Sequence, residues 1–239
     1  MNRKTLNIII FLFAFVVNAQ QDYSRNVVRN GNQVYLTGFK PMLQKGNNCS
    51  FYSTSMILAY YGNYIAPKKL SRNSNLNFSS TQKRSSTFMT QKLDSMGFYY
   101  FYTKEKHKAF FCEIIKFLID KGIPMRWECN MRFSPRKKER SNSFHARIIT
   151  GYIANKDKMT HILYTDSWGS GHINKLMDMP NAVKMTVLYG PIFPKKGNQQ
   201  MIDELKNIVD ELYSFRRYDK ILIEDTFREI RILAVFKES

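Results

Sequence analysis

Apolar residues recur every three to four positions in several parts of the chain, and most of these segments end at a glycine. This spacing is typical of amphipathic helices, and glycine readily adopts the left-handed conformation that often ends a helix. The segment 72–86 is instead rich in Ser, Asn and Thr, which indicates an exposed loop. The helices predicted on these grounds span residues 49–61, 87–96, 108–121 and 201–213.

Strand patterns dominate the middle and the end of the chain. Segments 145–154 and 161–165 are joined by the polar turn 155–158, which predicts an antiparallel hairpin. Because helices come first and antiparallel strands follow, the sequence predicts an α+β fold class. Further strands are predicted over residues 33–36, 123–129 and 183–189 and around 220–236.

The first 19 residues have the layout of a secretory signal peptide. Arg3 and Lys4 precede an apolar run over 8–17, and Ala19 supplies a small residue at the expected cleavage point. Ten residues in a helix are too short to cross a hydrocarbon core of about 30 Å. An uncleaved anchor is the alternative. We therefore expect a secreted or periplasmic protein without a stable membrane span once the signal is removed.

Composition narrows the classes of function. The chain has 239 residues, of which 44% are apolar, so it can bury a sizeable core. A net charge of +18 raises the question of an anionic partner. No module that interleaves aromatic and basic residues is present, so nucleic acid is not expected. Three cysteines without a CxxC motif indicate neither a disulfide scaffold nor a zinc site, although a bond between Cys112 and Cys129 stays open.

Cys49 is the candidate nucleophile because it stands at the start of the predicted helix 49–61. The positive end of the helix dipole stabilises a thiolate there and lowers the pKa of the thiol. A thiolate also requires a base, and His145 begins one strand of the predicted hairpin. If the hairpin pairs across its turn, His145 and Asp166 come opposite each other, and side chains in such positions lie about 5 Å apart. Asp166 would then orient the imidazole and support the imidazolium.

Two further residues belong to the predicted site. Gln44 shortly precedes Cys49, and its side-chain amide is the candidate oxyanion donor, together with the backbone N–H of Cys49. Trp168 follows Asp166 closely and is expected either to cover the His–Asp pair or to belong to the core.

Two stretches of the chain carry a known pattern. Residues 41–62 contain Pro-Met-Leu-Gln, then Asn-Cys, Met-Ile-Leu and Tyr-Gly; residues 145–152 read His-Ala-Arg-Ile-Ile-Thr-Gly-Tyr, and Asp-Ser-Trp-Gly follows at 166–169. In order and spacing they resemble papain-like bacterial peptidases, in particular the group of the double-glycine-leader peptidases of bacteriocin exporters and their free-standing relatives. Ser50 stands where that family usually has glycine. The resemblance implies a papain-like α+β fold with Cys49 as nucleophile, His145 as general base, Asp166 as orienter and Gln44 in the oxyanion hole.

These observations predict an exported cysteine peptidase that acts on a peptide or protein and needs no metal or organic cofactor. The expected organisation is a signal peptide over 1–19, a papain-like domain over 20–200, and a helix plus strands over 201–239 packed on that domain. Two alternatives stay open: an acyl transferase or amidase with the same triad, and a catalytically silent module that binds a peptide or protein. The basic loop from Arg136 to Arg140 is either a rim that favours acidic peptides or a solvated surface.

Overall fold

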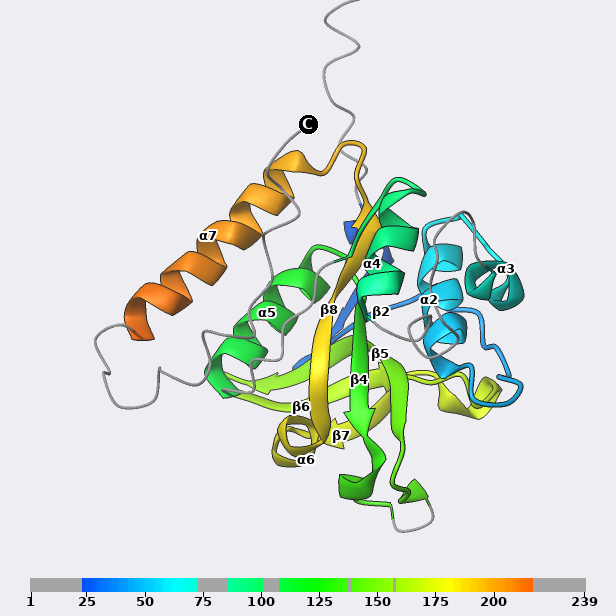
Figure 1. Ribbon diagram of the computed structural model, residues 1–239. Helices are drawn as coiled ribbons and strands as arrows, with labels where there is room; N and C mark the ends of the chain where they lie inside the picture. Colours follow the sequence, from blue (N-terminus) through cyan, green and yellow to red (C-terminus); the bar gives the residue numbers. More distant parts are fainter. Residues whose placement is uncertain (1–22, 73–85, 101–107, 137–138, 157, 217–239) are drawn as a thin grey trace, which may run out of the picture.

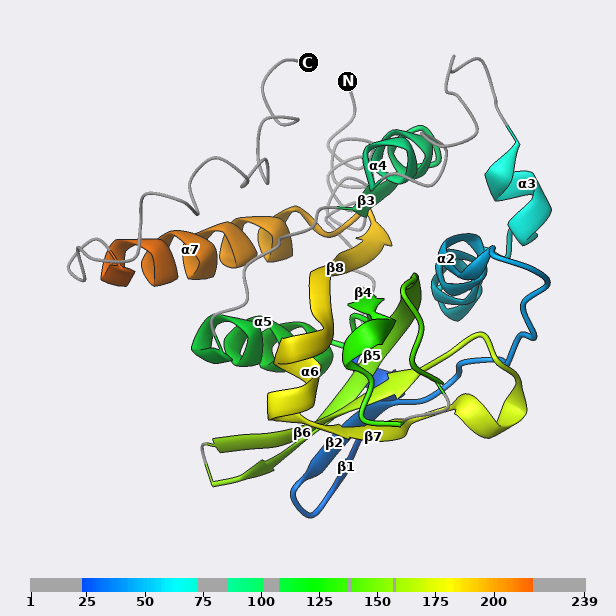
Figure 2. The same cartoon turned by 60° about the horizontal axis from the view of Figure 1, so that its bottom comes forward.

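A curled antiparallel sheet forms the centre of the molecule, and helices cover both of its faces (Figure 1). Helices α2 (Cys49–Tyr60) and α3 (Pro67–Ser71) lie on one side, and α5 (Lys108–Asp120) and α7 (Gln199–Arg216) lie on the other, as the turned view also shows (Figure 2). This mixture confirms the predicted α+β fold class. The computed structural model describes residues 23–72, 86–100, 108–136, 139–156 and 158–216.

Strand β5 (Phe144–Asn155) is the hub of the sheet, because it pairs with three other strands. The main path runs β1-β2-β5-β4-β8-β3, and β6 adds to β5 and carries β7. Every pairing is antiparallel. The other strands are β1 (Val27–Asn30), β2 (Gln33–Leu36), β3 (Phe98–Tyr100), β4 (Met125–Asn130), β6 (Lys158–Thr165), β7 (Lys175–Asp178) and β8 (Thr186–Pro194).

Gly151 explains how β2 approaches the middle of β5. It pairs with Tyr35, and a Cβ atom at this position would lie 2.5 Å from the carbonyl oxygen of Val34 and 2.7 Å from the Cβ of Tyr35. Only glycine lets two backbones come this close. The glycine inside a strand pattern therefore marks a close contact between strands.

Two apolar clusters bury the two faces of the sheet. The helix α5 contributes Phe111, Ile115 and Leu118 to the larger cluster, which also contains Trp127 of β4. The helix α2 is buried on most of its surface, and its residues Met56, Ile57 and Leu58 pack into the smaller cluster. Because α2 is held on several sides, its first residue has a fixed position relative to the sheet.

Most predicted elements are present within a few residues of their expected bounds. The helices α2, α4 (Ser86–Asp94), α5 and α7, the strands β2 and β4 and the hairpin β5–β6 confirm the corresponding predictions. The strand predicted over 183–189 is wrong in its first part, because α6 (Met179–Met185) precedes β8. The side chain of Asp178 accepts from the backbone N–H of Asn181, which caps this helix at its start.

The helix α7 packs onto the main core through Met201, Ile202 and Leu205. The predicted strands around 220–236, the signal segment 1–19 and most of the predicted loop 72–86 lie outside the described residues. Within the described ranges, no helix is both long and apolar enough to cross a membrane.

Candidate active site

Cys49 is the first residue of α2. The N–H groups of Phe51 and Tyr52 both donate to the carbonyl oxygen of Asn48, which closes the first turn of the helix. The thiol is half-buried and lies at the positive end of the helix dipole. This is the position that the sequence predicted for a reactive cysteine.

His145 and Asp166 form a buried hydrogen bond next to this helix. His145 is the second residue of β5, and Asp166 directly follows the end of β6. The Nε2 atom of His145 lies 2.7 Å from Oδ1 of Asp166, and the two residues are only 5% and 1% exposed. The sequence-predicted base and orienter are therefore in contact.

The register of the hairpin differs from the prediction. Ile148 pairs with Thr165, so the register continues with Asp166 opposite Arg147 and not opposite His145. Two register shifts along β5–β6 cancel, so both ends of the hairpin have the same register. His145 reaches Asp166 diagonally, because residues two positions apart in a strand point to the same face. The predicted contact is present, but the pairing from which it was argued is wrong.

The imidazole of His145 lies beside the thiol of Cys49 and interacts with it. Burial alone would raise the pKa of Cys49, but the interaction with the positive charge of His145 outweighs burial and lowers that pKa. Burial would lower the pKa of His145, yet its hydrogen bond to Asp166 and its interaction with Cys49 raise it to about 9. Both shifts favour a thiolate and an imidazolium. Since Asp166 occupies Nε2, the nitrogen left for the thiol is Nδ1.

The other two cysteines have the opposite character. Burial raises the pKa of Cys129 and also that of Cys112. Both are free thiols, so the disulfide left open by the sequence is absent from the structure. Of the three cysteines, all of them within the described residues, only Cys49 has a lowered pKa.

Trp168 covers the base. Its ring stacks on His145 with a centroid separation of 4.5 Å and an interplanar angle of 24°. A β-bridge joins Trp168 to Leu43, so the segment before the nucleophile is tied to the segment after Asp166. The expectation that this tryptophan lies over the His–Asp pair agrees with the geometry.

Gln44 also takes part in the contact between the segment before Cys49 and the segment after Asp166. Its backbone N–H donates to the carbonyl oxygen of Ser167 at 2.7 Å, and its Oε1 accepts from the hydroxyl of Ser167 at 2.6 Å. The Nε2 atom donates to the carbonyl oxygen of Gly46 at 3.1 Å. An amide nitrogen carries two N–H donors, so one remains for a further acceptor.

Sequence reasoning missed two arginines that lie beside the site. Arg126 of β4 is fully buried and donates to the hydroxyl of Ser50 at 2.7 Å, and it also contacts Tyr100 and Glu128. Arg147 of β5 is fully buried and donates to Asp166. The available signal was an arginine within an apolar strand pattern, where a charge is expensive to bury unless it is paired.

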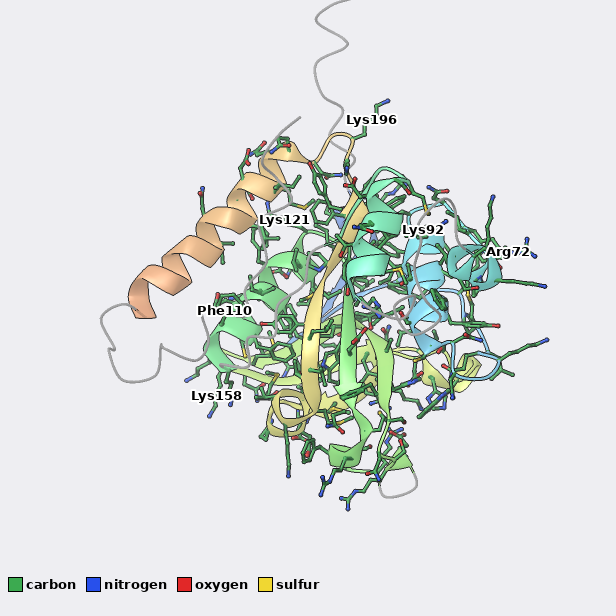
Figure 3. The ribbon with its side chains drawn as sticks, in the orientation of Figure 1. Arg72, Lys92, Phe110, Lys121, Lys158 and Lys196 are labelled. Atoms are coloured by element: carbon green, nitrogen blue, oxygen red, sulfur yellow. The ribbon has the colours of Figure 1, made fainter. Side chains whose placement is uncertain are left out.

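Some of the exposed positive charge of the described residues lies well away from this site. The exposed residues Arg72, Lys158 and Lys196 point outward from well-separated parts of the molecule (Figure 3). In the basic loop, Arg136 pairs with Glu139 at 3.1 Å, and Arg140 donates to the carbonyl oxygen of Ser134 at 2.9 Å. Both arginines therefore already have partners within the loop. Among the described residues, no cluster of three or more His, Cys, Asp or Glu is arranged to hold a metal ion.

Comparison with known proteins gives a family and a similar structure. A family described as Peptidase_C39 like family matches residues 29–190, which include Cys49, His145 and Asp166. The chain is also similar to the peptidase domain of Streptococcus ComA, a bi-functional ABC transporter involved in a quorum sensing pathway. That similarity has a TM-score of 0.43 and 14% sequence identity, and it covers 65% of this chain and 97% of that chain. No curated protein matches the chain.

Proposed function

Because the chain belongs to the Peptidase_C39 like family, we propose that it is a cysteine peptidase that hydrolyses peptide bonds through Cys49. One observation carries the proposal: Cys49, His145 and Asp166 come together from three separate parts of the chain, with Asp166 hydrogen-bonded to His145 and the imidazole of His145 lowering the pKa of the Cys49 thiol. A nucleophile, a base and an orienting acid in this order are the parts that acyl transfer requires.

The reaction starts from the thiolate–imidazolium pair. The thiolate of Cys49 attacks the carbonyl carbon, and the carbonyl electrons move to oxygen. The imidazolium of His145 then gives its proton to the leaving amine as the C–N bond breaks, which leaves an acyl-enzyme and a neutral imidazole. Water gives a proton to His145 and attacks the acyl carbon. Release of the carboxylic acid product restores the thiolate–imidazolium pair.

The negative oxygen of the tetrahedral intermediate needs donors that are already in place. The backbone N–H of Cys49 is one candidate, because the first N–H groups of a helix have no partner within it. The amide of Gln44 is the second candidate, since its oxygen is fixed by Ser167 and one of its N–H groups is available. Asp166 keeps the imidazole oriented throughout the cycle.

We also propose that the protein acts outside the cytoplasm, on a peptide or protein substrate. The basic and apolar layout of residues 1–19 supports export. The expected mature protein starts at Gln20, and N-terminal sequencing of the protein from the extracytoplasmic fraction tests this. Recovery of the chain with Met1 in the cytoplasm alone would contradict it.

Selective labelling of Cys49 tests the thiolate. The purified protein is treated with a limiting amount of iodoacetamide at pH 6, and the labelled residue is identified by peptide mapping. We expect one adduct, on Cys49, with none on Cys112 or Cys129, because a free thiol is almost fully protonated at this pH. Cys49→Ala should abolish labelling, and His145→Ala should slow it by at least tenfold. Equal labelling of all three cysteines would refute the proposed pair.

Cleavage itself is tested with a peptide library. The protein and its Cys49→Ala variant are incubated with the library, and new peptide termini are counted by mass spectrometry. New carboxyl termini that require Cys49 support hydrolysis. Conjugation to an added amine in place of water would identify an acyl transferase, and capture of peptides without new termini would identify a binding module. Either of these two outcomes would overturn the proposal of a peptidase.

A further inference from the structure

A fully buried arginine lies directly behind the orienting acid. The guanidinium of Arg147 is 0% exposed, and its Nε donates to Oδ2 of Asp166 at 2.9 Å. The guanidinium carbon lies 4.6 Å from the ring centroid of Tyr164 and 5.6 Å from that of Trp168. Removing a cation from water is unfavourable unless its partners replace the lost hydration. The position of Arg147 therefore requires the acidic partners that surround it.

The two oxygens of Asp166 are divided between two partners. Oδ1 meets Nε2 of His145 at 2.7 Å, and Oδ2 accepts from Arg147. A carboxylate is planar, so a partner that fixes Oδ2 also fixes the direction in which Oδ1 faces the imidazole. The rigid guanidinium suits this task better than a flexible ammonium group.

A second acid holds the arginine from the other side. Oε2 of Glu139 accepts from Nη2 of Arg147 at 2.9 Å, and the side chain of Glu139 is only 10% exposed. Glu139 also accepts from Arg136 and from the hydroxyl of Ser134. The charges therefore alternate in sign from the loop to the nucleophile, in the order Arg136, Glu139, Arg147, Asp166, His145 and Cys49.

We propose that Arg147 is a positioning residue that holds Asp166 in place for His145, and that Glu139 is the anchor that holds Arg147. This inference rests on the proposed roles of Cys49 and His145. It makes the loop that carries Glu139 part of the support of the catalytic pair. Neither Arg147 nor Glu139 contacts the reacting atoms in this arrangement.

Several ionisable groups lie next to this row of alternating charges and affect how the reactivity of Cys49 depends on pH. His145 and Arg147 come from β5, Asp166 from the segment after β6, and Glu139 from the loop before β5. Cys49 of α2 contacts His145, and Arg126 of β4 contributes a weaker positive field at that thiol. The thiol of Cys129 and the hydroxyl of Tyr164 lie close to Arg147, but burial raises the pKa of both groups. Neither titrates at neutral pH.

The sign of one measured shift separates positioning from a simple charge effect. The measured quantity is the midpoint pH for the reaction of Cys49 with iodoacetamide between pH 4 and 10. If Arg147 positions Asp166, Arg147→Met weakens the Asp166–His145 bond, and the imidazolium supports the thiolate less well. The midpoint then moves to higher pH, and one unit lowers the labelling rate on the acid side about tenfold. A pure charge effect gives a different pattern: Arg147→Lys, which keeps the charge, would leave the midpoint unchanged, and Glu139→Ala, which removes an anion, would move it to lower pH.

Milder variants keep the test valid if Arg147→Met does not fold. Arg147→Lys keeps the charge but loses the fork that spans two carboxylates, so it should shift the midpoint in the same direction. Glu139→Ala should also raise it, and Glu139→Gln should restore most of the parent behaviour because an amide oxygen still accepts from Arg147. Arg29→Met is the matched control, since it breaks the ion pair between Arg29 and Asp120 far from the site.

The outcomes for the variants and for the parent are distinguishable. Folded Arg147→Lys and Glu139→Ala proteins with the parent midpoint would overturn the inference, as would a shift to lower pH. A parent midpoint at the value of an ordinary thiol would instead refute the proposed function, whatever the variants do. A rise in both variants, without a change in Arg29→Met, supports the positioning role.

Discussion

Removing the thiol of Cys49 should change how the stability of the protein depends on pH. In the thiolate–imidazolium pair proposed above, the folded state holds one proton, on His145, whose charge lowers the pKa of the Cys49 thiol despite its burial. In the unfolded state, between pH 6.5 and 9, the pair also holds one proton, on Cys49. Because the folded and unfolded states bind the same number of protons, the pair does not make the free energy of unfolding depend on pH in this range.

Cys49→Ala breaks this balance. The pKa of His145 remains raised by Asp166, so the stability from His145 is fully present below pH 6.5 and is lost as the pH rises toward the folded pKa. One proton changes the free energy of unfolding by about 1.4 kcal/mol per pH unit. The pKa of about 9 for His145 in the parent sets an upper limit of about 3 kcal/mol on the stability that the variant loses as the pH rises. Because the thiolate that helps to raise this pKa is missing from the variant, we expect a loss of between about 1 and 3 kcal/mol.

Urea unfolding at pH 6.5, 7.5 and 8.5 measures the effect, with a reductant present to keep the unfolded thiols free. The parent should become more stable relative to Cys49→Ala as the pH rises, and other titrating groups cancel in this difference. Cys49→Ser is the matched control for volume and should behave like the alanine variant. A difference between parent and variant that stays constant across the three pH values would refute the thiolate–imidazolium pair.

Three further predictions concern single side chains. Asp166→Asn should slow labelling of Cys49 several-fold, because its NH2 group, a donor, replaces one of the two oxygens that meet His145 and Arg147; unchanged labelling would contradict the shared carboxylate. Gln44→Ala should leave labelling near normal but lower kcat on a cleaved peptide about 10²–10³-fold, as for loss of an oxyanion donor, and parent-like turnover would place the donor elsewhere. Gly151→Ala should lower the midpoint of thermal unfolding by several degrees or more, because its Cβ would meet the backbone of β2 at 2.5 Å; an unchanged midpoint would contradict the close approach.

Local patterns were sufficient to predict the elements that carry the site. Apolar spacing identified α2, α5 and the β5–β6 hairpin, since each has a long buried stripe or a clear turn. Short elements such as β1, β3 and α3 were missed because three to five residues hold too little periodicity. The strand prediction over 183–189 takes in the last three residues of α6, although the aspartate cap followed by Pro180 is a usable helix start signal.

The site was predictable in its residue types but not in its surroundings. The position of Cys49 at a helix start and the order Cys, His, Asp are features of the sequence alone. The diagonal contact of His145 with Asp166 depends on the strand register, which a turn length fixes only to within two residues. The pairing of Arg147 with Glu139 depends on how a loop folds back, and no local pattern encodes it.

The tie between Gln44 and Ser167 has a consequence for the order of events during synthesis. These two residues are 123 positions apart in the chain, and the base and its acid also lie far downstream of Cys49. A chain that has emerged only as far as α5 contains the nucleophile but none of the groups that ionise it. The thiol must therefore remain an ordinary, protonated cysteine until translation has passed Trp168. The cysteine peptidase proposed here would then be inert as a nascent chain and would acquire its reactivity in one late step, when the second half of the protein closes against the first.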